Sequence, residues 1–333
     1  MKKIPLIYGG KYSLKQFVKI FKKVNGKEII KQYIHAHVLI FALLEMLHLG
    51  VSKKSLEILR LAVNNKILIK LKKRYRNYIN QYLFDHKEEV PKIRSNKVWV
   101  CWLQGLDNAP TIVQKCYQSL TEKLSNREVI LITVDNYKKY IIFPDYIQKK
   151  IEKGIISKTH MSDLLRLELL TRYGGTWIDA TVLCVSENIP DYMINSDLFM
   201  FQNLKPGVDG HPLRISNWFI TSCTNEPILT LTLSLLYDYW KNHNQLVDYF
   251  IFHDFCELAI DAYPEEWSRV VPFSNSTSHI LLLRLFYQYD DDMWDNIKEM
   301  VPFHKLSYKF DETQYHKKGT YYDAIINRIG GFE

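Results

Sequence analysis

Apolar side chains recur at intervals of three and four residues from position 11 to position 83, which is the spacing of helices with one buried face. Gly50 interrupts this recurrence, and Ser52, a residue type that caps helix starts, follows two positions later. Within the region, residues 67–82 combine apolar or aromatic side chains with a basic face. The pattern predicts three or four helices before residue 90.

The pattern changes at Pro91 to short apolar runs separated by turns. Residues 97–103 form an aromatic and β-branched run of strand type, which ends at a turn. A helix-like stretch follows at residues 111–124 and a second strand-like run at residues 128–134. Strand, helix and strand in this order predict a parallel βαβ unit.

An apolar helix is expected at residues 157–173, where it stops at a double glycine, and a strand is expected directly afterwards at residues 176–183. The remaining expected elements are strands at residues 198–202 and 217–222 and helices at residues 144–150, 229–239, 246–263 and 278–289. Strands that alternate with helices predict an α/β fold, with helical regions before and after the sheet.

The composition is that of an ordered chain, because 47% of the 333 residues are apolar and 14% are aromatic. The longest apolar run, residues 38–44, is far shorter than the roughly 20 residues of a membrane-spanning helix. The first residues lack the apolar stretch of a secretory signal, so we expect a cytoplasmic protein. The five cysteines lack the paired spacing of zinc or redox sites and are expected to be free thiols.

Positive charge is concentrated near the amino terminus. Residues 1–90 contain 19 Lys or Arg and 6 Asp or Glu, a balance of +13, whereas the other residues contain 25 and 30, a balance of −5. A basic helical segment suits an anionic membrane surface, nucleic acid or a partner protein, and equally a set of solvated helix faces. We predict a basic helical region over residues 1–90 and an α/β domain over residues 91–333.

Three of the charged residues in the most apolar part of the chain are candidates for chemistry. Asp163 and Arg166 are three positions apart, so both side chains share one face of the helix, and Asp179 interrupts the strand that follows. Charges in such surroundings are costly unless they are paired or meet a polar ligand. Open α/β sheets bind ligands at the carboxyl ends of their strands, where we place Asp179. Spacing alone leaves open that Asp163 is a helix cap or only an ion-pair partner of Arg166.

The motif DxxR at residues 163–166, followed by GGxxxD at residues 174–179, resembles the sugar-binding and DxD region of glycosyltransferases with the GT-A fold. The nearest likeness is to glycosyltransferase family 32 and, within it, to bacterial capsular polysaccharide synthesis proteins. Five segments resemble the family in order: VWVCWLQGLDNAP, HMSDLLRLELLTRYGGTWIDATV, NWFITS, DYWKNHNQLVDYFIFHDF and FHKLSYK. The resemblance implies a Rossmann-like α/β domain with a mixed sheet that binds a nucleotide sugar.

The resemblance also implies roles for particular residues. Asp163 and Arg166 would hold hydroxyls of the donor sugar, and Asp179 would meet the ribose and a metal ion. Independently of the resemblance, an aromatic side chain such as Trp102 at a strand end offers a plane on which a base can stack. The residues that we assign to the nucleotide are Trp102, Gln104, Gly105, Gly175 and Thr181, together with Lys305 and Lys309.

A divalent cation, Mn²⁺ or Mg²⁺, is expected as cofactor, because such a cation neutralises a leaving diphosphate and takes oxygen ligands. The predicted metal ligands are Asp179 and His304. This chain departs from the DxD pattern, since Thr181 stands where the second carboxylate would be. A hydroxyl can still bind a cation or a phosphate, but it removes one negative charge from the site.

The late segment FHKLSYK contains His304, Lys305 and Lys309. Related transferases place a metal- or phosphate-binding residue on a late, mobile loop, and we assign this segment to that role. The two lysines supply compact positive charge for a diphosphate leaving group. The alternative for His304 is a surface-loop histidine without a ligand.

The resemblance predicts a retaining hexosyltransferase. The donor would be a nucleoside diphosphate sugar, a uridine one first, and the acceptor a glycan or lipid-linked oligosaccharide of a capsular or other cell-surface polysaccharide. Residues 1–90 would contact the anionic inner face of the plasma membrane. A non-catalytic protein that binds nucleic acid or a membrane surface is the alternative suggested by charge, although the chain has no zinc spacing or helix-turn-helix pattern and we expect no nucleic-acid partner.

Overall fold

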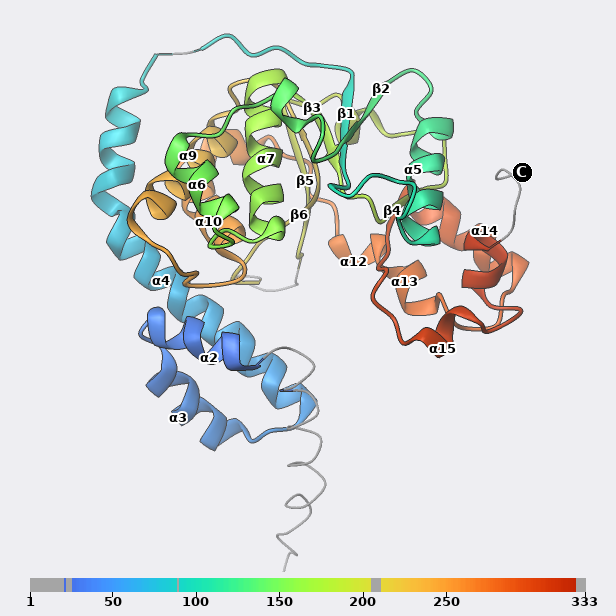
Figure 1. Ribbon diagram of the computed structural model, residues 1–333, viewed down its shortest axis with the longest axis horizontal. Helices are drawn as coiled ribbons and strands as arrows, with labels where there is room; N and C mark the ends of the chain where they lie inside the picture. The colour runs from blue at the N-terminus through green and yellow to red at the C-terminus, as the bar shows by residue number, and fades with distance from the viewer. Residues whose placement is uncertain (1–20, 22–25, 89, 205–210, 328–333) are drawn as a thin grey trace, which may run out of the picture.

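The computed structural model describes Phe21 and residues 26–88, 90–204 and 211–327, and a mixed sheet lies at its centre (Figure 1). The strands of this sheet are β1 (Lys97–Cys101), β2 (Glu128–Ile132), β3 (Gly175–Ile178), β5 (Leu198–Gln202) and β6 (Ile215–Ser222). A second, two-stranded sheet consists of β4 (Val182–Cys184) and β7 (Phe303–Lys305). Helices before residue 26 that the sequence predicts lie outside the described residues.

The strand order of the main sheet is β2-β1-β3-β6-β5. β1 is parallel to both β2 and β3, whereas β6 is antiparallel to both β3 and β5. β3 therefore lies where the sheet changes from parallel to antiparallel. The βαβ unit expected from the sequence is confirmed, because β1, helix α5 (Thr111–Lys123) and the parallel strand β2 follow one another. The predicted α/β class and mixed sheet are also confirmed.

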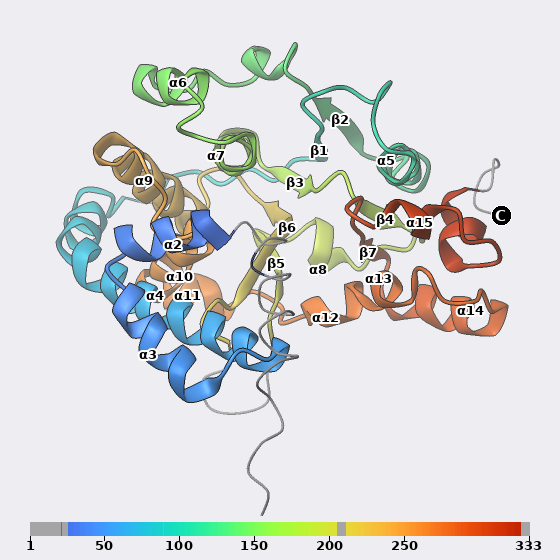
Figure 2. The ribbon, with the colours of Figure 1, turned by 60° about the horizontal axis from the view of Figure 1, so that its bottom comes forward.

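Helices cover the sheet and extend from both sides of it (Figure 2). Before β1 they are α2 (Gly26–His35), α3 (Leu39–Leu49) and α4 (Lys53–Asp85). Between β2 and β7 they are η1 (Tyr137–Lys139), α6 (Asp145–Glu152), α7 (Lys158–Tyr173), α8 (Asp191–Ile194), α9 (Pro227–Asn242), α10 (Ile251–Ala262), α11 (Pro264–Ser268), α12 (Asn275–Ser278), α13 (Ile280–Arg284) and α14 (Asp291–Met300). After β7 come α15 (Glu312–Tyr315) and η2 (Tyr322–Ile326).

The core has two parts, one on each face of the main sheet. Neighbouring residues of a strand enter different parts, as the two-residue period of a strand requires: Trp99 joins α4, α7, α9 and α10, whereas Val98 and Val100 join α5, β4 and the carboxy-terminal helices. The same alternation holds on β3, where Trp177 enters the first part and Ile178 the second. Both faces of the sheet are therefore buried.

The amino-terminal helices follow the sequence pattern. Gly50, with a φ of +80°, ends α3, and the Ser52 hydroxyl caps α4 by accepting a hydrogen bond from the Ser55 N–H at 3.1 Å. α4 packs against α10, where the rings of Tyr75 and Phe255 lie 4.9 Å apart. The domain boundary at residue 90 stays a prediction.

The predicted strand at residues 176–183 is wrong in one respect, because the chain forms two strands there. The Asp179 N–H still donates to the Trp218 carbonyl of β6. The chain then turns, and the Val182 N–H donates to the Asp179 carbonyl at 3.0 Å. The next residues leave the main sheet and pair with β7. Residues on both sides of the break are buried, so the hydrophobic pattern continues across it and does not mark it.

Two expected helices are also shorter than predicted. The helix predicted at residues 246–263 begins only at Ile251, because residues 246–250 form turns around the side chain of Asp248, which accepts from the Phe250 N–H. Residues 278–289 contain the short helix α13 instead of one long helix. In both cases buried apolar residues in irregular segments, such as Val247 and Leu285, imitate a helical pattern. The five cysteines are free thiols, as predicted.

Candidate active site

The double glycine brings α7 directly to the start of β3. Gly174 and Gly175 have φ values of +65° and +95°, which favour glycine, and the Gly174 N–H closes α7 by donating to the Leu170 carbonyl. A Cβ on Gly175 would collide with the carbonyl of Lys97 on β1. Gly175 thus lies at the opposite end of β3 from Asp179. The close approach of β1 is by itself a sufficient reason for a glycine at this position.

Asp179 follows the last residue of β3, at the carboxyl edge that β1 and β3 share as parallel strands. Arg166 on α7 reaches it, with Nη2 at 3.2 Å from Asp179 Oδ1. The indole Nε1 of Trp177 donates to the same oxygen at 3.0 Å. A helix face and a strand end, thirteen residues apart in the chain, therefore meet at one carboxylate.

Asp163 completes this group from one turn earlier on α7. Its Oδ1 accepts from Arg166 Nη1 at 2.9 Å and from Asn217 Nδ2 of β6 at 3.0 Å. Both Asp163 and Arg166 are buried, and Arg166 also lies over the Trp177 ring, with Cζ at 4.7 Å from the centroid. Burial raises the pKa of Asp163 to about 6, and the charge of Arg166 opposes that rise.

Lys305 brings a second positive charge to Asp179 from the carboxy-terminal part of the chain. Its Nζ lies 3.3 Å from Asp179 Oδ2 and donates to Thr181 Oγ1 at 2.5 Å. Because β7 pairs with β4 directly after the break at Thr181, the two sheets bring these residues together. We call Asp163, Arg166, Asp179, Thr181 and Lys305 the charged cluster.

Of the residues assigned to the nucleotide, all but Gly175 lie on or after strand ends near the same edge. Trp102 follows β1, and its ring contacts the edge of the Tyr308 ring with centroids 5.3 Å apart. The turn after it closes through Gly105, whose N–H donates to the Trp102 carbonyl and whose φ is +76°, while the Gln104 side chain is exposed. Lys309 is exposed, with Nζ at 5.5 Å from the Tyr308 ring centroid. Aromatic and basic groups thus adjoin the charged cluster.

Comparison with known proteins places the chain in a family. The model of the capsular polysaccharide synthesis protein family matches residues 50–325, which include β1, α7, β3 and β7. The chain belongs to this family. The match covers every residue of the charged cluster.

Two curated relatives are similar over a shorter stretch. O-glycosyltransferase braB of Annulohypoxylon truncatum is 29% identical over 99 residues, which are 27% of this chain and 24% of that protein. Glycosyltransferase afumC of Aspergillus fumigatus is 29% identical over 98 residues, which are 27% of this chain and 25% of that protein. The alignments thus span about a quarter of each relative's length.

Among solved structures, the PaToxG glycosyltransferase matches with a TM-score of 0.35 and 13% identity, over 80% of this chain and 97% of that one.

The sequence of this member of the capsular polysaccharide synthesis family predicted a late loop at His304. That prediction is wrong. His304 is the middle residue of β7 and fully buried. Since neighbouring strand residues point to opposite faces, Lys305 reaches Asp179 while the His304 imidazole lies near Trp294, with ring centroids 6.2 Å apart. Burial lowers the pKa of His304 to about 4. Its role as a metal ligand stays a prediction that this orientation does not favour.

The oxygen atoms around Asp179 do not fit a divalent cation in this arrangement. Asp179 Oδ1 accepts from Arg166 and Trp177, while Asp179 Oδ2 and Thr181 Oγ1 both meet the Lys305 ammonium. In the described part of the chain, no group of three or more His, Cys, Asp or Glu side chains could hold a metal ion. The cofactor expected from the sequence stays a prediction.

Sequence reasoning missed two contacts of the charged cluster. Asn217 and Trp177 are not among the predicted site residues, although both donate hydrogen bonds to cluster carboxylates. The available indication for Asn217 was an amide side chain directly before the apolar run Trp218–Ile220 of the strand. Trp177 gave no such indication, because a buried indole is an ordinary core residue in sequence.

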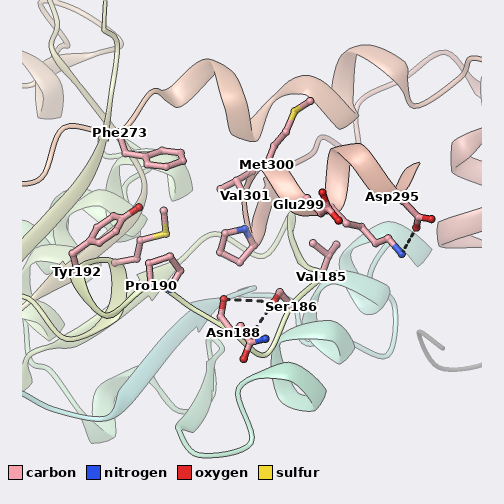
Figure 3. Close-up of a pocket in the computed structure, with 13 residues that line it drawn as sticks. Val185, Ser186, Asn188, Pro190, Tyr192, Phe273, Asp295, Glu299, Met300 and Val301 are labelled. Atoms are coloured by element: carbon pink, nitrogen blue, oxygen red, sulfur yellow. Dashed lines mark hydrogen bonds and ion pairs between the residues drawn. The ribbon is translucent and has the colours of Figure 1, made fainter. Parts of the chain in front are cut away.

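Two hollows lie outside the charged cluster. A cavity of about 520 Å³ between the segment after β4 and α14 has walls that include Val185, Tyr192, Phe273 and Met300 (Figure 3). A second hollow of about 430 Å³ lies beside the turn after β1 and is lined by residues such as Asp107 and Tyr117. No residue of the charged cluster lines either one, so we assign the site from the convergence of charged residues and not from cavity size.

Proposed function

We propose that this protein is a retaining glycosyltransferase that moves a hexose from a nucleoside diphosphate sugar, a uridine one first, to a lipid-linked oligosaccharide in the synthesis of a capsular or other cell-surface polysaccharide. The observation that supports this most is the convergence of Asp163, Arg166, Asp179 and Lys305 at one edge of the main sheet. Family membership supports the polysaccharide, and similarity to two glycosyltransferases supports the reaction.

The charged cluster suits the two halves of such a donor. The carboxylate of Asp163 accepts hydrogen bonds and the guanidinium of Arg166 donates them, which is what sugar hydroxyls require. Lys305 and the exposed Lys309 supply positive charge for a diphosphate. Trp102, at the end of the neighbouring parallel strand, offers an aromatic plane for the base. Sugar, diphosphate and base would thus lie along one sheet edge.

In the proposed transfer, the bond between the anomeric carbon and the diphosphate oxygen breaks, and the diphosphate keeps the electron pair. The acceptor hydroxyl oxygen bonds to the same face of that carbon, and its proton passes to the released diphosphate. Lys305 stabilises the charge that develops there, while Asp163 and Arg166 orient the sugar. We nominate no covalent nucleophile, because Asp163 and Asp179 are both already ion-paired.

A donor screen tests this function. UDP-hexoses, followed by other nucleoside diphosphate sugars, are added to the full chain with and without Mn²⁺, and melting temperature and nucleoside diphosphate release are measured. A donor that binds the native state raises the melting temperature, and we expect release with that donor alone. The anomeric coupling constant of the product measures retention. If no nucleotide sugar stabilises the protein and none is cleaved, the proposed function is wrong.

We also propose that the amino-terminal helices bring the enzyme to an anionic membrane, where a lipid-linked acceptor would lie. Among the described residues, no helix has the length and apolar character needed to cross a bilayer. The residues Ile40, Leu43, Leu44 and Leu47 are between 47% and 78% exposed and form one stripe on α3. The +13 balance of residues 1–90 complements an anionic lipid surface, on which an apolar stripe can insert.

Vesicle flotation tests the membrane contact. The wild-type chain should float with vesicles that contain phosphatidylglycerol and remain behind with pure phosphatidylcholine. The double variant Leu44→Gln/Leu47→Gln should lose flotation, whereas Ile142→Gln, which changes an isoleucine of similar exposure elsewhere, should keep it. Equal flotation of both variants would exclude the α3 stripe as the contact.

A further inference from the structure

β7 fixes Lys305 beside the two positions at which a DxD motif would hold its cation. Lys305 pairs with Val182 in the register of the small sheet, and the Leu306 N–H donates to the Thr181 carbonyl at 2.8 Å. The lysine therefore starts from a backbone that is fixed relative to Thr181. Its side chain is 19% exposed, so the protein surrounds most of it while part of it can still meet a ligand.

The contacts of the ammonium are those that a shared cation would make. Lys305 Nζ donates to Thr181 Oγ1 at 2.5 Å and lies 3.3 Å from Asp179 Oδ2. A cation held jointly by side chains 179 and 181 would contact the Thr181 hydroxyl oxygen and a carboxylate oxygen of Asp179. In this structure the lysine already contacts both.

The charges of the cluster also balance without a metal ion. When ionised, Asp163 and Asp179 contribute two negative charges, and Arg166 and Lys305 contribute two positive ones. A divalent cation would add two positive charges within a few ångströms of an ammonium, which is unfavourable by Coulomb's law. An aspartate at position 181 would have left a surplus negative charge to attract the cation, but this chain has Thr181.

We infer that the Lys305 ammonium takes the place of the divalent cation, so that this protein binds and releases the diphosphate of its donor without a metal ion. The inference rests on the proposed function, since it concerns how the donor diphosphate is held. Thr181 orients the ammonium through its hydroxyl, and Asp179 balances its charge. A diphosphate that approaches this edge meets a positive charge that the fold supplies.

Calorimetric titration of the full chain with UDP, in excess EDTA and then in Mn²⁺, tests the inference directly. GDP, ADP and CDP are titrated beside it. We expect one nucleoside diphosphate to bind in EDTA, with an affinity that Mn²⁺ changes by less than about threefold. Binding that EDTA abolishes and Mn²⁺ restores would overturn the inference but leave the proposed function standing. No binding under either condition would overturn the proposed function itself.

Substitution of the lysine provides a second readout. Lys305→Met keeps most of the side-chain length but removes the charge, and should weaken UDP binding by at least about tenfold, as expected for loss of a charged hydrogen bond. UMP, which lacks the second phosphate, should lose less than about threefold. Lys298→Met on α14 is the matched control, because Lys298 pairs with Asp295 and lies outside the cluster. Equal losses for UDP and UMP would contradict the assigned role.

The converse substitution should create a metal requirement. The double variant Thr181→Asp/Lys305→Met restores the DxD carboxylate and removes the ammonium, so UDP binding should become weak in EDTA and recover by at least about tenfold in Mn²⁺. A circular dichroism melting curve checks that the variant is folded. A folded variant that binds UDP equally well in both solutions would show that residues 181 and 305 do not determine how the diphosphate is held.

Discussion

Asp163 on α7 and Asp254 on α10 are both buried carboxylates, and both of their helices contact β6, yet their surroundings differ. Asp163 accepts hydrogen bonds from Arg166 and Asn217, whereas neither oxygen of Asp254 has a hydrogen-bond partner among the described residues. Burial raises the pKa of both groups. Arg166 opposes the rise at Asp163, while the negative charges of Asp248 and Glu257 increase it at Asp254.

The comparison shows that burial by itself does not indicate function. A carboxyl group inside a helix bundle loses its charge, because nothing nearby compensates the lost hydration. Asp163 on α7, which faces the edge of the sheet, can be ionised because the Arg166 guanidinium and the Asn217 amide are fixed beside it. The charged cluster is therefore where ionic chemistry is possible. Substitutions in the cluster should change activity, whereas substitution of the buried Asp254 on α10 should not.

The largest effect is expected for Asp179→Ala, which removes the carboxylate on which Arg166 and Lys305 converge. Transfer from the donor found in the screen should fall by at least about 10²-fold, the scale of losing one group that organises transition-state charge. Asp197→Ala, which breaks an exposed pair with Arg94, is the control and should leave the rate unchanged. If Asp179→Ala transfers sugar at the wild-type rate, the cluster has only a structural role, as we expect for Asp254.

Arg166→Lys should come next, because it keeps the charge but loses the fork that reaches two carboxylates at once. We expect kcat/KM to fall by about 10- to 100-fold, with a smaller change in melting temperature than Asp179→Ala produces. Arg172→Lys, on the same helix and paired with Glu168, controls for the exchange itself. An unaltered donor affinity in titration would remove Arg166 from the sugar-binding role.

The pKa of about 6 at Asp163 predicts that activity and stability respond oppositely to pH. The folded-state pKa lies above the value of about 3.9 in unfolded chains, so the native state binds more protons between these values and the free energy of unfolding falls as pH rises through that window. Activity needs the ionised carboxylate, so kcat/KM should rise up to tenfold per pH unit below a midpoint near 6. Asp163→Asn should remove this limb, and a flat profile in the wild type would contradict the assignment.

The smallest effect is expected for Asp254→Asn, which should not change transfer. Burial and two neighbouring negative charges raise the pKa of Asp254, so the native state holds its proton and stability is lost as pH rises above the unfolded-state pKa. Asparagine needs no proton, so the stability of the variant relative to the wild type should be greater at pH 8 than at pH 5.

Melting curves at the two pH values measure the difference, with Asp295→Asn on the surface as control. If the difference is the same at both pH values, Asp254 does not hold its proton in the native state.

Several parts of the site follow from local sequence. Helical spacing places Asp163 and Arg166 on one face, and the double glycine leads α7 into β3. The approach of Arg166 to Asp179, thirteen residues later, is therefore predictable, and Asp163 follows from sharing its helix face. The segment FHKLSYK also indicated that Lys305 supplies positive charge to the site. What could not be predicted was that β7 would present Lys305 to Asp179 and turn His304 into the core, because that depends on which strand β7 pairs with and in which register.

Side chains close together in the chain, or motifs in a fixed order, are enough to predict the βαβ unit, the cap at Ser52, the end of α7 and the family of the chain. The break of β3 at Asp179 and the contact of Lys305 with Thr181 across 124 positions depend instead on how the whole chain packs. Pairing over such distances is selected by the packing of both faces of a sheet, and a one-residue shift of β7 would exchange the lysine for the histidine.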